Sequence, residues 1–196
     1  MITKKQFDVL EFLTEHSGKV SQRSIAQGTG LSVGAVNKLM AELSEMDCVA
    51  DGIITEQGYS VLEPYRVKRA IFIAAGFGSR LAPITFNTPK PLVRVKGQRI
   101  IDALIDAVLA QGINEIYVVR GYLGEQFDQL LYKYPMIKFI ENPVYNEANN
   151  ISSMYCASYL LKNAYVLEGD LLLYNPALIK KYQYMSNYLW VPVEKT

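Results

Sequence analysis

Residues 70–92 read AIFIAAGFGSRLAPITFNTPKPL: an apolar run, a glycine-rich segment, and then a lysine between two prolines. A continuous apolar run is typical of a buried parallel strand. The two glycines let backbone N–H groups approach a ligand, and Arg80 and Lys90 indicate that this ligand is anionic. The stretch therefore predicts a phosphate-binding loop at the end of a buried strand.

From residue 70, strand and helix patterns alternate along the chain. Strand patterns cover 70–74, 115–119, 137–140 and 164–170, and helical patterns cover 97–112, 124–134 and 149–161. Such alternation predicts an α/β fold with a Rossmann-like parallel sheet and helices on both faces. In these sheets ligands bind beyond the carboxyl ends of strands, which is where the loop and Glu168-Gly169-Asp170 both fall.

The loop matches neither of two common phosphate-binding motifs. GxxxxGK[ST] is absent, and Gly76-x-Gly78 is followed by Leu81 where the dinucleotide fingerprint needs glycine. The longer string AAGFGSRL, continued by Pro83, Thr85 and PKPL, resembles the signature of nucleotidyltransferases that activate sugar phosphates and related phosphates, a superfamily with a GT-A-like fold. Within it, residues 66–196 resemble the CTP-dependent phosphocholine cytidylyltransferases, on the stretches VKRAIFIAAGFGSRL, GINEIYVVRGYLGEQFDQL and EANNISSMYCA.

The resemblance implies a role for each polar residue of the loop. Arg80 would hold triphosphate oxygens and Lys90 would neutralise phosphate at the reacting centre, so these two are the expected catalytic residues; the alternative is a pair of ordinary surface cations. Asp170 is the expected Mg²⁺ ligand, with Glu168 as a weaker candidate. The expected nucleotide-binding set is Ala74, Ala75, Gly76, Phe77, Gly78, Ser79, Arg80, Asn149, Asn150 and Ser153.

The last three of these would meet cytosine, since amide groups suit its donor and acceptor edges, but the asparagine pair would also serve as a helix cap. The implied reaction transfers CMP from CTP to phosphocholine or a similar phosphorylated amine and releases pyrophosphate. A sugar-1-phosphate or aminoalkylphosphonate acceptor, another base, or a nucleotide-sensing transcriptional regulator are the alternatives. The resemblance covers only the nucleotide-binding half of a catalytic domain, so we expect a shortened domain with exposed sheet edges that forms a homo-oligomer.

Residues 1–66 follow a different pattern and predict a winged helix-turn-helix domain, which leaves 67–196 for the nucleotidyltransferase domain. Thr3, Ser21 and Ser32 can each cap a helix. Asp51-Gly52 is a strong signal for a tight turn between the β-leaning runs of 48–62, which would form the wing. A short helix, a tight turn and a second helix together make a helix-turn-helix.

In such a domain the helix that starts at Ser32 would enter the major groove of DNA, with Ser32, Asn37 and Lys38 near base edges. Residues 1–69 carry eight Lys/Arg and nine Asp/Glu, a net charge of −1. Phosphate neutralisation supplies most non-specific affinity for DNA, so the charge favours the alternative of a winged helix kept for dimerisation or regulation.

The composition of the chain limits which other classes of protein it could belong to. The chain has 196 residues, 50% hydrophobic, and a formal net charge of +1, so no global field draws it to nucleic acid or membrane. No apolar run approaches the roughly 20 residues of a membrane helix. Cys48 and Cys156 lack CxxC spacing and His16 is the single histidine, which leaves little material for a zinc site. We expect a cytoplasmic protein.

Overall fold

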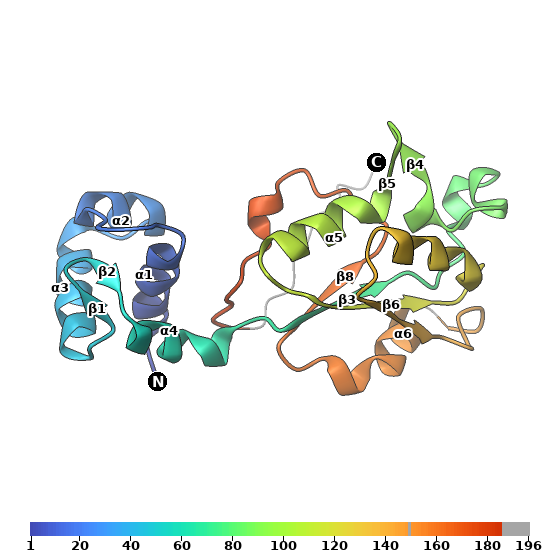
Figure 1. The fold of residues 1–196 in the computed structure, drawn as a ribbon. Helices are drawn as coiled ribbons and strands as arrows, with labels where there is room; N and C mark the ends of the chain where they lie inside the picture. The colour runs from blue at the N-terminus through green and yellow to red at the C-terminus, as the bar shows by residue number, and fades with distance from the viewer. Residues whose placement is uncertain (149, 186–196) are drawn as a thin grey trace, which may run out of the picture. The chain divides into compact units, whose positions relative to one another are not determined.

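The computed structural model describes residues 1–148 and 150–185, and these form two compact units (Figure 1). Among the described residues, unit 1 is Met1–Arg66 together with 182–185, and unit 2 is Val67–Lys181. The sequence patterns predict one domain for residues 67–196. In the structure Tyr182 instead forms an antiparallel bridge with Arg66 and is buried in the core of unit 1, because its ring fills space beside the N-terminal helices.

Unit 1 contains the predicted helix-turn-helix and wing. Its first three helices are α1 (Lys4–Thr14), α2 (Gln22–Thr29) and α3 (Val33–Glu45), and the wing strands are β1 (Val49–Ala50) and β2 (Ile53–Ile54). Thr3, Ser21 and Ser32 cap the helices as predicted. Asp51 and Gly52 close the hairpin with φ angles of 52° and 79°, a left-handed conformation that suits these two residue types.

A fourth helix of unit 1 was not predicted. The end of the second β-leaning run forms α4 (Glu56–Leu62), which continues into the 3₁₀ turn η1 (Glu63–Tyr65). Thr55 starts this helix, since its hydroxyl accepts a hydrogen bond from the Gly58 N–H at 3.1 Å. The cap and the burial of Leu62 outweigh the β-leaning composition of the segment.

Unit 2 is built on a four-stranded parallel sheet in the order β7-β6-β3-β8. The strands are β3 (Arg69–Ile73), β6 (Glu115–Arg120), β7 (Ile137–Glu141) and β8 (Ala164–Glu168), each of them at a predicted position. The register sets Ile73 beside Val119 on one side and beside Glu168 on the other. The carboxyl ends of β6, β3 and β8 therefore lie along one edge of the sheet.

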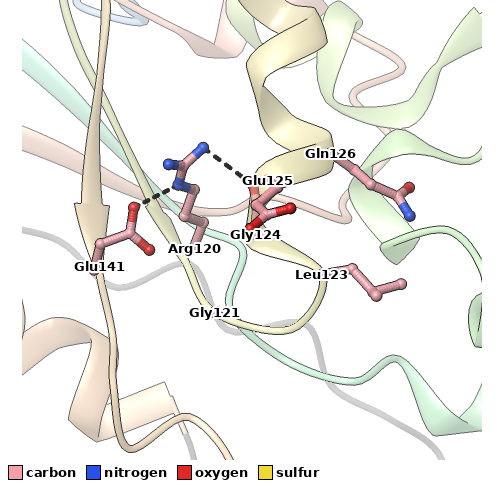
Figure 2. Close-up of a pocket in the computed structure, with 7 residues that line it drawn as sticks. All are labelled: Arg120, Gly121, Leu123, Gly124, Glu125, Gln126 and Glu141. Carbon is pink, nitrogen blue, oxygen red and sulfur yellow. Dashed lines mark hydrogen bonds and ion pairs between the residues drawn. The ribbon is translucent and has the colours of Figure 1, made fainter.

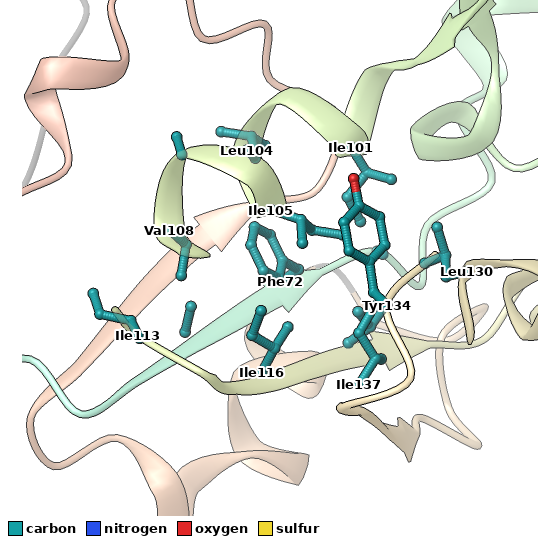
Figure 3. Close-up of a cluster of buried hydrophobic side chains, with 14 of the residues drawn as sticks. Phe72, Ile101, Leu104, Ile105, Val108, Ile113, Ile116, Leu130, Tyr134 and Ile137 are labelled. Carbon is teal, nitrogen blue, oxygen red and sulfur yellow. The ribbon is translucent and has the colours of Figure 1, made fainter. Parts of the chain in front are cut away.

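Helices α5 (Ile100–Ala110) and α6 (Asn150–Cys156) cover opposite faces of this sheet, as predicted (Figure 1). The larger core lies under α5, where Phe72 of β3 packs among Leu104 and Ile105 (Figure 3). The predicted helix at 124–134 is a 3₁₀ helix, η5 (Gly124–Tyr132). The remaining elements of unit 2 are short: the hairpin β4 (Arg94–Val95) and β5 (Gln98–Arg99), and the 3₁₀ turns η2 (Ser79–Leu81), η3 (Ile84–Phe86), η4 (Lys90–Leu92), η6 (Ser158–Leu160) and η7 (Pro176–Leu178).

No helix in the described part of the chain combines the length and the apolar character that crossing a bilayer requires.

The core under α5 generates a stability prediction. Phe72 is fully buried, so Phe72→Ala removes its packing and leaves a cavity that should lower the free energy of unfolding by about 3–5 kcal/mol. Urea denaturation followed by far-UV circular dichroism measures this. Tyr132→Ala, at a side chain that is 95% exposed, is the control and should change the value by no more than about 0.5 kcal/mol. Equal effects of the two substitutions would contradict the assignment of this core.

Candidate functional site

The glycine-rich loop leaves the sheet directly after β3. The Ala74 N–H donates to the Val119 carbonyl at 2.9 Å, and the Ala75 carbonyl accepts from the Tyr122 N–H at 3.0 Å. Ala74 was predicted to bind nucleotide, but its N–H is committed to β6 and is not free to bind a phosphate. Among the described residues, the N–H groups of 75–79 donate to no protein acceptor, so a row of five backbone donors remains for an anion.

The two glycines of the loop have different structural roles. Gly78 has a φ angle of 63°, and a Cβ there would lie 3.0 Å from the Lys90 Cβ and 3.1 Å from the Thr85 Cγ2. Thr85 also donates its hydroxyl to the Gly78 carbonyl at 2.9 Å. Gly76 is open, with nothing within 4 Å of an added Cβ. Glycine is thus required at 78, where the loop folds back toward Lys90.

Lys90 and Asp170 meet at this edge of the sheet. The Lys90 Nζ donates to the Asp170 Oδ2 at 2.6 Å, and the two side chains are 32% and 33% exposed. Asp170 is brought there because the Gly169 N–H donates to the Ile73 carbonyl at 2.8 Å, which extends the β3–β8 pairing past the strand end. Arg80 lies exposed on η2 with no acidic partner among the described residues. The segment therefore carries two cations: Lys90, which is paired with Asp170, and Arg80, which has no acidic partner in the described chain.

The residues predicted to contact cytosine have different partners in the structure. The Asn150 Nδ2 donates to the Glu168 Oε1 at 2.8 Å, which places Asn150 beside the acidic end of β8. Ser153 is buried, and its Oγ accepts from the Asn142 Nδ2 at 3.0 Å, so this hydroxyl is engaged within the protein. Asn149 lies outside the described residues.

Glu168 lies in an environment that opposes its ionisation. Desolvation at the strand end raises the pKa of the Glu168 carboxyl above its ordinary value, and the negative charge of Asp170 adds to this. The hydrogen bond from Asn150 and the charge of Lys90 act in the opposite direction on that pKa. A cation that joined the two carboxylates would therefore be stabilised by both.

The donor set fits magnesium in one specific way. Within residues 1–148 and 150–185, no group of three or more His, Cys, Asp or Glu side chains could enclose a metal ion by itself. Magnesium, however, takes one or two carboxylates together with phosphate oxygens and water. Asp170 keeps its Oδ1 without a hydrogen-bond partner in the described chain, and Glu168 is two residues away. These two carboxylates suit an ion that arrives with a polyphosphate.

The residues predicted to contact DNA lie at the start of α3, and two of them are engaged within unit 1. Ser32 accepts from the Ala35 N–H as the helix cap, at 3.2 Å. The Asn37 Nδ2 donates to the Gln22 Oε1 at 3.3 Å. Lys38 is 81% exposed and lies 3.9 Å from Glu42, a distance at which the attraction is weak in water.

Sequence reasoning missed Arg120, which ends β6 at the same edge of the sheet. Its Nε donates to the Glu141 Oε1 at 2.6 Å, its Nη1 donates to the Asp128 Oδ1 at 2.5 Å, and the guanidinium stacks 4.1 Å from the Phe139 ring centre. It lines an open pocket of about 580 Å³ (Figure 2), together with Gly121, Leu123, Gly124, Glu125, Gln126 and Glu141. With its Nε and Nη1 already bonded, Arg120 holds the turn after β6. Its place at a strand end was the available signal.

Comparison with known proteins shows the family to which unit 2 belongs. Residues 69–177, more than half of the chain, match the family model described as nucleotidyl transferase. The chain belongs to the nucleotidyl transferase family. Residues 2–50 match a model described as winged helix-turn-helix DNA-binding.

Three curated relatives are cytidylyltransferases. The chain is 45% identical over 106 residues to a 2-aminoethylphosphonate cytidylyltransferase from Lancefieldella rimae, covering 53% of this chain and 43% of that protein. It is 43% identical over 102 residues to a choline-phosphate cytidylyltransferase from Streptococcus pneumoniae, covering 52% and 44%. A CTP:phosphoglutamine cytidylyltransferase from Campylobacter jejuni is 40% identical over 104 residues, covering 53% and 41%.

One solved structure extends the comparison to three dimensions. It is a CTP:phosphocholine cytidylyltransferase from Streptococcus pneumoniae, with a TM-score of 0.54 and 43% identity over 57% of this chain and 48% of that one. The matched part of the chain thus spans less than half the length of each of these relatives.

The geometry of the loop predicts unequal roles for its glycines. Gly78→Ala should lower the free energy of unfolding by about 1–2 kcal/mol, because alanine is strained at positive φ and its Cβ crowds Lys90. Gly76→Ala is the matched control, and should stay within about 0.5 kcal/mol of the wild type. Both are measured by urea denaturation, and a larger loss for Gly76→Ala than for Gly78→Ala would contradict the loop geometry.

Proposed function

We propose that unit 2 binds CTP through the loop at 75–80 and forms the nucleotide-binding part of a cytidylyltransferase, which transfers CMP to phosphocholine or a similar phosphorylated amine. The observation that carries the proposal is the row of five unpaired N–H donors beside Arg80 and the Lys90–Asp170 pair. The nucleotidyl transferase match and the three cytidylyltransferase relatives support it.

The proposed reaction is an in-line displacement at the α-phosphorus of CTP. A phosphate oxygen of the acceptor forms the new bond to that phosphorus, the bond to the oxygen bridging to the β-phosphate breaks, and pyrophosphate leaves. The acceptor oxygen is already anionic, so no protein base has to remove a proton. Catalysis then rests on positioning and on charge neutralisation, which agrees with a chain that has a single histidine.

Each residue of the site has a task in this proposal. The N–H groups of 75–79 receive phosphate oxygens, and the exposed Arg80 can grip two oxygens with its forked donors. Lys90, held between Pro89 and Pro91, offsets negative charge at the reacting phosphate. Asp170, with Glu168 beside it, would hold Mg²⁺, which when bound adds positive charge across the phosphates.

The acceptor is the less constrained half of the proposal. The three relatives are named for aminoethylphosphonate, choline phosphate and phosphoglutamine, and a sugar-1-phosphate remains the wider alternative. Because the candidate site is the part that would hold the nucleotide, it supports the donor CTP more strongly than any one acceptor.

A cytoplasmic location is part of the proposal, since CTP is an intracellular metabolite. So is self-association through the sheet edges β7 and β8, which a mass measurement in solution would test.

Nucleotide binding tests the proposal. Arg80→Ala and Lys90→Ala should each weaken CTP binding by at least about 10-fold in titration calorimetry, because each removes a charged hydrogen bond to phosphate. Magnesium should strengthen the binding of CTP to the wild type, and Asp170→Asn should remove that gain. CTP should also bind more tightly than UTP, GTP or ATP.

Lys133→Ala is the control, because this lysine pairs with Asp106 at 2.9 Å, outside the loop, and should leave CTP binding unchanged. If Arg80→Ala and Lys90→Ala both bound CTP as the wild type does, the proposed site would be wrong. If another nucleotide bound more tightly, the site would stand and the choice of cytidine would be wrong.

A second function, DNA binding by unit 1, is favoured by the winged helix-turn-helix match over residues 2–50. We propose that α3 contacts the major groove and that Lys38, 81% exposed on this helix, contacts a phosphate. In this form the protein would be a regulator whose second unit senses a nucleotide. The net charge of −1 over residues 1–69 argues that any such binding is weak.

Anisotropy of a labelled DNA duplex at several salt concentrations tests this second function. Lys38→Ala should reduce the slope of log affinity against log salt by about one, because one phosphate contact is lost. Lys5→Ala, an exposed lysine on α1, is the control and should keep the wild-type slope. Absence of salt-dependent binding by the wild type would remove DNA binding from consideration.

A further inference from the structure

Tyr122 contacts the phosphate-binding segment at three separate points. Its backbone N–H donates to the Ala75 carbonyl at 3.0 Å, at the start of the loop. Its ring lies 4.8 Å from the Phe77 ring, centre to centre, in the middle of the loop. Its hydroxyl lies 3.1 Å from the Thr85 carbonyl oxygen and 3.0 Å from that of Phe86, so its single proton is shared between these two acceptors.

Because Tyr122 bonds to both ends of the segment 75–86, it holds these two ends close to one another. Thr85 also donates its hydroxyl to the Gly78 carbonyl, which joins the later part of the segment to the loop at 2.9 Å. Gln126, in the turn that follows Tyr122, adds a hydrogen bond to the Asn87 carbonyl at 2.9 Å. Phe77 is 45% exposed, so the protein covers only part of it and the Tyr122 ring is one of its two aromatic neighbours. The turn after β6 is therefore the support on which the loop rests.

This support is important for ligand binding because the loop would bind an anion through its backbone. The N–H groups of 75–79 serve an anion only if they converge, and each residue of a free loop loses conformational entropy when it is fixed. A loop already held in the bound shape loses less on binding. Tyr122 fixes both ends of the segment without occupying any of the five free donors.

We propose that Tyr122 is a positioning residue for the triphosphate of CTP: it holds the loop so that its N–H groups and Arg80 face the polyphosphate. This inference rests on the proposed function, because it presupposes that the loop binds a nucleotide. It adds a residue on β6's side of the sheet to a site otherwise made by the segments after β3 and β8. The hydroxyl is the part of the side chain that reaches the far end of the segment.

Tyr122→Phe tests the inference, because it removes only the hydroxyl and keeps the ring and the backbone hydrogen bond. Titration calorimetry with CTP and with inorganic tripolyphosphate should show affinity lowered by about 3- to 10-fold for both, as expected for the loss of one hydrogen bond. Tripolyphosphate isolates the phosphate part of the ligand. Tyr132→Phe, at the 95% exposed tyrosine, is the matched control and should bind both ligands as the wild type does.

Limited proteolysis gives a second readout. Trypsin should cut the Arg80–Leu81 bond faster in Tyr122→Phe than in the wild type, since the loop is less well held, and saturating tripolyphosphate should slow that cleavage. A purely structural role would lower the melting temperature of Tyr122→Phe and leave both the affinity for tripolyphosphate and the Arg80–Leu81 cleavage rate unchanged. That result would overturn the inference alone. A wild-type protein that bound neither CTP nor tripolyphosphate would overturn the proposed function and the inference with it.

Discussion

The parallel pairing of β3 with β8, with Ile73 opposite Glu168, is the constraint on which the candidate site depends. It ends two strands at the same level, so the segments that follow them emerge side by side. The two segments lie close together where they leave the sheet: a Cβ on Gly169 would lie 3.1 Å from both the Ala74 Cβ and the Ile73 carbonyl oxygen. Lys90 and Asp170, 80 residues apart in the chain, become hydrogen-bonded neighbours as a result.

The ion pair at this edge contributes little to stability by itself. Both side chains are about one third exposed, and pairs of this kind contribute about 0–1 kcal/mol in water. A phosphate that approached Lys90 would meet a cation held in place by a carboxylate, and Asp170 would remain within reach of a cation brought by the ligand. Since Glu168 is disfavoured as an anion, positive charge added here relieves an existing repulsion between carboxylates.

Much of this arrangement follows from local sequence patterns. Apolar runs identified the four parallel strands, and the rule that ligands bind at carboxyl ends predicted that the loop and Asp170 would share an edge. What escaped prediction depends on contacts between distant residues: Tyr122 to Thr85, the burial of Ser153 against Asn142, and the return of Tyr182 to unit 1. The missed helix α4 differs, since its Thr55 cap is local and was hidden by neighbouring β-branched residues.

The return of the chain at Tyr182 makes unit 2 an insertion within unit 1. Val67 and Lys181, the first and last residues of unit 2, are joined by an N–H to carbonyl hydrogen bond of 2.9 Å. A domain whose two ends touch can be excised or grafted into another host loop with little disturbance, because no gap has to be bridged where it is removed. In evolutionary terms, this geometry lets unit 2 be gained or lost as one piece while its host keeps a continuous backbone.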